Sequence, residues 1–175
     1  MKRHDVAPIC NTKCFSFALL TTLLLCSMST ANATSRDPGL PNPQITPGAI
    51  NPAVTQANIH LTICVSGFTK TIRPPSSYTN HIKYSQLDSG YNYKGDTNPA
   101  DYEEDHLVPL EVGGDPTSVK NLFPQPWHVT WNAGTKDRLE NKIHSLVCTG
   151  AMTLPAAQKM FMSNWIIGYQ KFVGK

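Results

Sequence analysis

The sequence predicts an α+β domain, and three observations support this fold class. Apolar residues alternate with other residues over 59–65, which is typical of a half-buried strand. A strand-turn-strand pattern with a Gly-Gly pair near its centre spans 102–127. Two later segments, 131–150 and 153–172, carry apolar side chains at helical spacing. We therefore expect a small antiparallel ribbon combined with an N-terminal strand region and additional helices.

The first 33 residues have the composition of a secretory signal peptide. A leader containing Lys2 and Arg3 precedes the apolar block CFSFALLTTLLLCSMS, and the small-residue pattern ANA follows at 31–33. This block is shorter than the stretch of about 20 residues that crosses a bilayer as a helix. We expect cleavage after Ala33, a secreted or periplasmic protein, and no membrane association afterwards. The alternative is an uncleaved membrane anchor.

The charge of the chain argues against binding through a broad basic surface. The sequence has 15 Lys and Arg residues against 12 Asp and Glu residues, a net charge of +3 at pH 7, and part of this excess lies in the signal segment. The sequence shows no basic stripe of the kind that nucleic-acid-binding surfaces use. Any chemistry on nucleic acid must therefore be located in a specific site.

Cysteine usage predicts one disulfide bond. Three of the five cysteines lie in the signal segment, which leaves Cys64 and Cys148. A pair of cysteines in an exported chain is typical of a disulfide, and neither belongs to a CxxC motif of the zinc-binding kind. Closing so long a loop stabilises a protein by about 3–5 kcal/mol in the chain-entropy treatment. The alternative is two buried thiols.

The segment before the ribbon is expected to contain a linker, strands and one helix. Residues 34–57 are rich in Pro, Gly and Asn and predict a flexible, extended or disordered linker, so the domain would span 58–175. The strand over 59–65 would break at Gly67, and a second candidate strand would end at Pro74-Pro75.

SSYTNHIKYSQLDSG then predicts a short helix. Ser76 or Ser77 is its expected cap, and Ile82 and Leu87 are expected to face inward. Residues 91–100 are expected to form a loop because of their Gly, Asn and Pro content.

Two helices are expected after the ribbon. The segment 131–150 has Thr135 as its candidate cap and Gly150 just past its end. The segment 153–172 has Thr153 as its cap and Pro155 in its first turn. The apolar stripe of the second helix is expected to belong to the core and consists of Met160, Phe161, Trp165, Ile166, Tyr169 and Phe172.

Polar residues gather around the ribbon, beginning with EEDHLVPLEVGG at 103–114. His106 and Asn121 are equally distant from the Gly113-Gly114 pair, so an antiparallel ribbon turning there would place them roughly opposite each other. The next helix carries four polar residues on one face: Asp137, Glu140, Asn141 and His144. We expect Asp105, His106, Asn121 and this helix face to converge on one point.

This arrangement resembles the HNH endonucleases of the ββα-metal superfamily. In that family an Asp-His or His-His pair opens the first strand, an Asn follows in the second, and an Asn or His lies on the helix. The runs RPPSSYT, EEDHLVPLEVGG, NLFPQPW, KDRLENKIHSLVCTG and LPAAQ are similar to a group of exported bacterial HNH-like proteins, over roughly Ile63 to Trp165. The inserted HVTWNAGT makes the spacing to the helix longer than in compact HNH motifs, so position alone does not fix the helix residue.

The resemblance implies a ββα-metal core and a secreted endonuclease that hydrolyses phosphodiester bonds of nucleic acid, with DNA favoured over RNA. His106 would be the general base. Asp105 would hold one divalent ion, with Mg²⁺ expected, together with Asn141 as first choice or Glu140 as second. Asn121 would hold His106 in place. Because adjacent residues on a regular strand face opposite ways, Asp105 and His106 share a site only if the strand starts or kinks there.

Other interpretations remain open from the residues alone. His144 is either functional or a half-buried structural histidine, and Asp137 is expected to be a first-turn charge on the helix dipole. Lys136 and Arg138 are expected on the solvated surface. The alternative function is a non-catalytic exported binding module that keeps an HNH-like fold, and the near-neutral charge favours it. A toxin nuclease with a partner inhibitor is a third possibility.

Overall fold

The computed structural model describes residues 37–174. The expected signal peptide and residues 34–36 lie outside the described residues. The elements in chain order are the 3₁₀-helix η1 (Gln56–Leu61), the helices α1 (Phe68–Ile72) and α2 (Ser76–Asp88), the 3₁₀-helix η2 (Pro99–Asp101), the strand β1 (Tyr102–His106), the 3₁₀-helix η3 (Leu110–Val112), the strand β2 (Leu122–Pro126), and the helices α3 (Ala133–Cys148) and α4 (Leu154–Phe172). Helices combined with a two-stranded antiparallel sheet confirm the α+β class.

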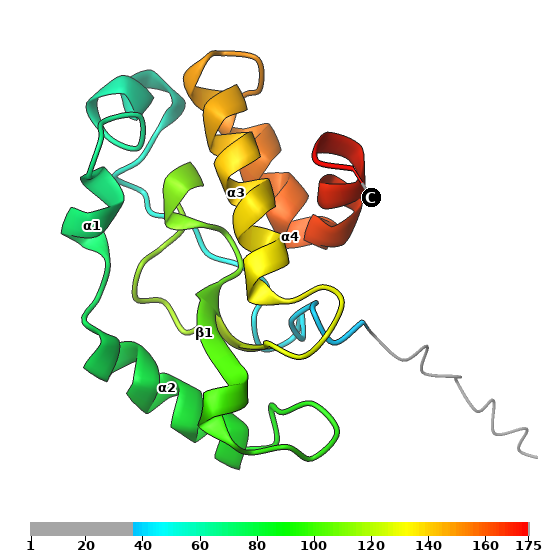
Figure 1. The fold of residues 1–175 in the computed structure, drawn as a ribbon. Helices are drawn as coiled ribbons and strands as arrows, with labels where there is room; N and C mark the ends of the chain where they lie inside the picture. The colour runs from blue at the N-terminus through cyan, green and yellow to red at the C-terminus, as the bar shows by residue number, and fades with distance from the viewer. Residues whose placement is uncertain (1–36, 175) are drawn as a thin grey trace, which may run out of the picture. The chain divides into compact units, whose positions relative to one another are not determined.

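The region before α2 is helical and irregular, which corrects the prediction of two strands there. Residues 56–61 form η1 and residues 68–72 form α1, seen before α2 in Figure 1. Of the alternating residues only Ile59 and Ile63 are buried, whereas Leu61 is 80% exposed. Two buried residues four positions apart fit the spacing of helical turns better than that of a strand, which would bury every second residue.

Helix α2 is confirmed and packs against both strands. Ile82 and Leu87 are buried as expected. The residue in the N-cap position is Pro75, with no side-chain cap bond, so the predicted serine cap is wrong. Gln86 in the last turns donates from Nε2 to the carbonyl oxygen of Leu122 at 3.0 Å, which ties α2 to the start of β2.

Strands β1 and β2 pair antiparallel, with Tyr102 opposite Pro126 and His106 opposite Leu122. The connection between them is a long loop over 107–121 and not a tight turn at Gly113-Gly114. The apolar LVPLEV sequence, expected as a strand, forms a buried loop that contains η3. Asn121 lies one residue before β2, and its carbonyl oxygen accepts a hydrogen bond from the amide of Leu107 at 2.7 Å.

The two C-terminal helices are present where the sequence predicts them. Thr153 accepts a hydrogen bond from the amide of Ala156, which confirms it as the cap of α4. The cap of α3 is Asn132, whose side chain accepts from the amide of Thr135 at 2.9 Å, so Thr135 is not the cap. The core contains Phe161, Trp165, Ile166 and Tyr169 of the predicted α4 stripe, with Met160 and Phe172 partly buried against it.

Residues 37–57 have little regular structure but are packed, which corrects the expectation of a flexible linker. The indole nitrogen of Trp165 donates to the carbonyl oxygen of Gly39 at 2.9 Å. The hydroxyl of Thr46, a fully buried residue, donates to the carbonyl oxygen of Leu122 at 3.2 Å. Val54 belongs to the main core cluster. This segment therefore forms part of the packed domain.

The disulfide between Cys64 and Cys148 is present as predicted. It joins the chain just after η1 to the last residue of α3, with a Cα–Cα distance of 5.6 Å across 84 positions of sequence. Within residues 37–174, no helix has the length and apolar character needed to cross a membrane.

Candidate functional site

A buried ion cluster between β1 and α3 forms the centre of the candidate site. Lys136 of α3 is fully buried, and its ammonium group contacts three oxygen atoms. It donates to the main-chain oxygen of His106 at 2.6 Å and forms ion pairs with Asp105, at 2.9 Å, and with Glu140. A lysine has three N–H donors, so these three contacts account for all of them. The ammonium group therefore lies between the two carboxylates.

Lys136 remains charged in this position. Burial acts to lower its pKa, but the carboxylates of Asp105 and Glu140 outweigh burial and raise the pKa overall. The expectation that Lys136 lies on the solvated surface is wrong. A usable signal was present in the sequence, because Lys136 and Glu140 are four residues apart and so share one face of a helix.

Asp105 and His106 make contacts in different directions, as alternation along a strand requires. Asp105 contacts α3 through Lys136, while the Nε2 atom of His106 lies 3.0 Å from the carbonyl oxygen of Pro116 in the loop before β2. The two residues remain linked because Asp105 Oδ1 accepts a hydrogen bond from the amide of His106 at 2.7 Å. The described contacts thus give Asp105 and His106 separate partners.

His106 has the features of a neutral, fixed imidazole. The residue is buried, and burial lowers its pKa most strongly; the bond to Pro116 and the charge of Asp105 act in the opposite direction. A neutral imidazole that donates from Nε2 to a carbonyl carries its lone pair on Nδ1. No residue within 37–174 makes a hydrogen bond to Nδ1, so this atom can accept a proton.

Asn121 fixes the loop that lies beside His106. Its side chain is fully buried and uses both its oxygen and its nitrogen. Oδ1 accepts from the amide of Val108 at 2.9 Å, and Nδ2 donates to the carbonyl oxygens of Val108 and Asp115, each at 3.0 Å. The next residue after Asp115 is Pro116, the partner of the His106 ring. This geometry supports a positioning role for Asn121, which stays a prediction with respect to catalysis.

Of the helix residues proposed as ligands, only Glu140 reaches the ion cluster. The side chain of Asn141 is exposed and donates to the carbonyl oxygen of Asp137 one turn earlier. The described contacts do not join it to Asp105. His144 lies further along α3, where its Nε2 atom is 2.9 Å from the carbonyl oxygen of Ile63. The predicted face of α3 is therefore split between the ion cluster and the disulfide region.

Several carboxyl groups surround Asp105 with few cations among them. Burial, then the charges of Asp105 and Asp137, raise the pKa of Glu103 to about 7. Burial and the charge of Asp105 also raise the pKa of Asp137, and Glu111 adds to this effect. The positive charges that oppose these shifts come from Lys136 and from Arg73, which follows α1. Negative charge is thus in excess around Asp105.

Three side chains outside the ion cluster come nearest to the geometry of a metal site. Among residues 37–174, donor atoms of three His, Cys, Asp or Glu residues lie within 4.8 Å of one another only at Cys64, His144 and Cys148. These donors are close enough to hold a metal ion, and their nitrogen and sulfur atoms suit a softer ion than Mg²⁺. The two sulfur atoms are bonded to each other, and a thiolate ligand would require that bond to be reduced.

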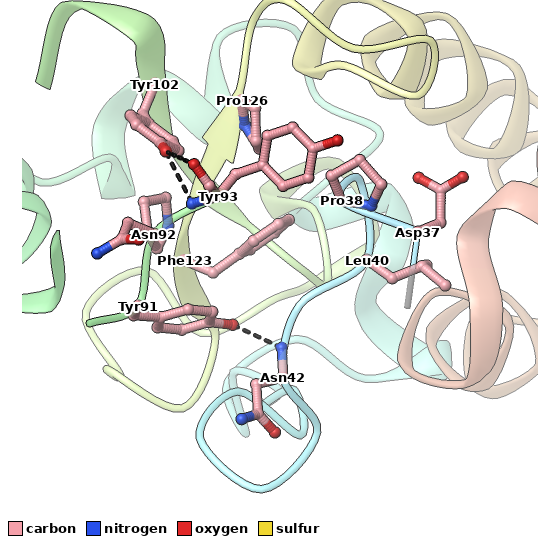
Figure 2. A pocket seen from close by; sticks show the side chains of 11 residues that line it. Asp37, Pro38, Leu40, Asn42, Tyr91, Asn92, Tyr93, Tyr102, Phe123 and Pro126 are labelled. Atoms are coloured by element: carbon pink, nitrogen blue, oxygen red, sulfur yellow. Dashed lines mark hydrogen bonds between the residues drawn. The ribbon is translucent and has the colours of Figure 1, made fainter. Parts of the chain in front are cut away.

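The hollow shown in Figure 2 lies elsewhere on the domain. Its volume is about 170 Å³, and it is lined by the segment 37–42, the loop around Tyr91 and Tyr93, and residues of both strands such as Tyr102 and Phe123. The hydroxyl of Tyr91 accepts a hydrogen bond from the amide of Asn42 at 2.8 Å, drawn as a dashed line in Figure 2. Neither Asp105 nor His106 lines this hollow.

No protein-family model, curated protein or solved structure matches this chain. These comparisons therefore give no support to the expected similarity to HNH endonucleases.

Proposed function

We propose that the protein is an exported phosphodiester hydrolase that acts on nucleic acid with the help of one divalent ion. The observation that carries this proposal is the protonation state of His106 together with the contact that fixes its ring. Its Nε2 atom is fixed by the carbonyl of Pro116, and the imidazole is neutral beside a carboxyl-rich group. A neutral imidazole with a free nitrogen can take a proton from water at neutral pH, which is what a general base does.

The donor chemistry around Asp105 fits a hard divalent cation such as Mg²⁺. Asp105 Oδ2 is buried and paired with the ammonium group of Lys136 at 2.9 Å, and the carboxyl groups of Glu103 and Asp137 are near enough for the charge of Asp105 to raise their pKa values. Their donor atoms do not lie within 4.8 Å of one another in residues 37–174, so the side chains of these three residues would have to move together to hold the ion. When bound, the ion would stabilise charge on a phosphate and on a leaving oxygen. Glu140, already paired with Lys136, would act by keeping Lys136 against Asp105.

The remaining residues would orient the base. Lys136 bonds the main-chain oxygen of His106, and Asn121 secures the loop that presents the carbonyl of Pro116. Both ends of the His106 residue, its backbone and its ring, are thereby held. Such fixed positioning lets the imidazole accept a proton without reorganising during the reaction. The disulfide supports the exported location, because such bonds persist in oxidising compartments.

The replacement His106→Ala tests the proposal. We expect Mg²⁺-dependent cleavage of plasmid DNA to fall by about 10²–10⁴-fold, the usual contribution of a general base. His60, an exposed histidine of η1, provides the matched control, and His60→Ala should cleave at the wild-type rate. Far-ultraviolet circular dichroism should show both variants folded. Cleavage by His106→Ala at the wild-type rate would overturn the assignment.

A non-catalytic binding module is the second candidate, and the position of Lys136 favours it. The lysine already neutralises Asp105 and Glu140, so these two carboxylates have a cation without any metal. Digestion of DNA and RNA with and without chelator separates the candidates. Binding of a ligand that survives chelation, with no digestion of either nucleic acid, would support the module.

A further inference from the structure

Arg73 stands at the edge of the candidate site on the side of α1. It follows the last residue of α1, and its side chain is 54% exposed. Its described ion pair is with Glu111 of η3, at 3.9 Å between Arg73 Nη2 and Glu111 Oε1. This distance is longer than a charge-assisted hydrogen bond, which spans about 2.7–2.9 Å. The guanidinium group is therefore held loosely.

The charge of Arg73 affects titratable groups on two elements, β1 and α3. It contributes to lowering the pKa of His106 on β1, and it opposes the rise in the pKa of Asp137 on α3 and of Glu103 on β1. The contact to Glu111 places the guanidinium group beside η3, and η3 packs against α3, the helix that carries Lys136 and Asp137. His106, the proposed general base, and the carboxyl groups near Asp105 lie in the same region.

The donors of Arg73 are unused. A guanidinium group has five N–H donors, and no hydrogen bond joins the Arg73 side chain to any residue in the described part of the chain. Neighbouring cations differ from it: Lys136 is enclosed by three oxygens, and Arg138 lies over the ring of Tyr169 and donates to Thr135. Arg73 is thus a cation near His106 whose guanidinium N–H groups are free to bind an anion.

We infer that Arg73 binds the phosphate group of a phosphodiester and presents it to His106. The planar fork of arginine matches the non-bridging oxygens of phosphate and can bind two of them at once. Glu111 competes weakly for the same donors, because its contact is long. The inference rests on the proposed function for the identity of the anion, a phosphodiester, and adds the residue that holds it.

Binding measured without cleavage tests this inference. The probe is a fluorescein-labelled single-stranded DNA oligonucleotide, and the protein is the full chain carrying His106→Ala, so that catalysis does not consume the probe. Adding Arg73→Ala should weaken binding about tenfold, the effect of losing one hydrogen-bonded charge contact. The slope of log affinity against log salt should become shallower by about 0.7, as expected for one phosphate contact fewer on a single strand.

Matched variants separate a specific contact from a change in net charge. Lys70→Ala removes an exposed cation of α1 and should leave affinity and salt slope unchanged. Glu111→Gln should tighten binding, because it removes the competing carboxylate. The thermal midpoint of Arg73→Ala should stay close to that of its parent, since exposed ion pairs contribute about 0–1 kcal/mol.

The outcomes distinguish this inference from the proposed function. Weakened binding by Arg73→Ala, with wild-type protein that does not cleave, would support the phosphate site and overturn the hydrolase proposal. Equal weakening by Arg73→Ala and Lys70→Ala would overturn the inference, because only net charge would then matter. Unchanged binding by Arg73→Ala would overturn it as well, even if the wild-type protein cleaves DNA.

Discussion

Lys136 is stable in the interior because three oxygen atoms replace its hydration shell. Burying an ammonium ion costs several kcal/mol unless its partners are well placed. Here a main-chain carbonyl and two carboxylates satisfy every donor. Removing only the lysine would leave Asp105 and Glu140 as buried charges without a cation. Lys136 therefore balances the charges of Asp105 and Glu140, and it also links the backbone of His106 to α3.

Glu104 is the opposite case, a buried carboxyl group without a partner. Both of its side-chain oxygens are buried and make no hydrogen bond within residues 37–174. Burial and then the charge of Asp105 raise its pKa from the ordinary 4.5 to about 9, although Lys83 opposes the shift. Between these values the folded protein keeps a proton that the unfolded chain releases. Stability is therefore highest below the lower value and falls as the pH rises.

Glu104→Gln should remove this loss of stability. A neutral amide has nearly the same shape and does not ionise, so we expect the variant to be more stable than wild type by roughly 1–3 kcal/mol near pH 8. Near pH 5 the two should differ much less. Urea unfolding at both pH values measures the effect, and Asp88→Asn, at the exposed end of α2, is the control. Equal losses for wild type and Glu104→Gln on raising the pH would contradict the prediction.

Motif residues could be identified from the sequence, but their contacts could not. The pattern of Asp105, His106 and Asn121 predicts that Asn121 holds His106 in place, and the hydrogen bonds of Asn121 to Val108 and Asp115 are compatible with that role, which stays a prediction. The role of Lys136 was missed because lysines are rarely buried, and burial depends on how α3 packs on β1. Arg73 opens the run RPPSSYT, but nothing in that run assigns the arginine a role. It comes close to the site through the path of the chain between α1 and α2.

At the scale of elements, the spacing of apolar residues predicted the helices α2, α3 and α4, whereas among their expected caps only Thr153 of α4 was right. The strand predicted over 59–65 was wrong because short alternating patterns also arise where one face of a helical turn is buried. The apolar run LVPLEV was expected to be a strand for a similar reason. It is buried as a loop because Asn121 satisfies its backbone groups at Val108, which a ladder partner would otherwise do.

The disulfide is the covalent link between two of these elements. It joins the chain after η1 to the end of α3 across 84 positions, so it restricts the unfolded chain strongly. The double replacement Cys64→Ser with Cys148→Ser should lower the free energy of unfolding by about 3–5 kcal/mol. Guanidinium unfolding measures this loss, and wild-type protein kept in a dithiol reductant should show the same loss. Reduced and oxidised wild type of equal stability would contradict the prediction.

At the scale of the whole domain, the candidate site is built from segments far apart in the sequence. Arg73 comes from the α1–α2 junction, Asp105 and His106 from β1, and Lys136 from α3. The N-terminal segment 37–57 contributes to the same domain by covering the core at Trp165 and bonding to the start of β2 through Thr46. Composition indicates a lack of regular structure there, but it carries no information about burial, so the packing of this segment could not be predicted.

Gly39 provides a test of that packing. A Cβ atom added to Gly39 would lie 2.1 Å from the carbonyl oxygen of Trp131, a backbone atom that cannot move away cheaply. Gly39→Ala should therefore displace the segment, break its hydrogen bond with the buried indole of Trp165, and lower the free energy of unfolding by about 1–3 kcal/mol. Tryptophan fluorescence and limited proteolysis near residue 40 should both report the displacement.

Gly134→Ala is the matched control, because its added Cβ would meet its nearest atom at 3.6 Å and alanine favours a helix. A flexible linker would tolerate both replacements equally, so identical behaviour of the two variants would show that the segment does not pack as described.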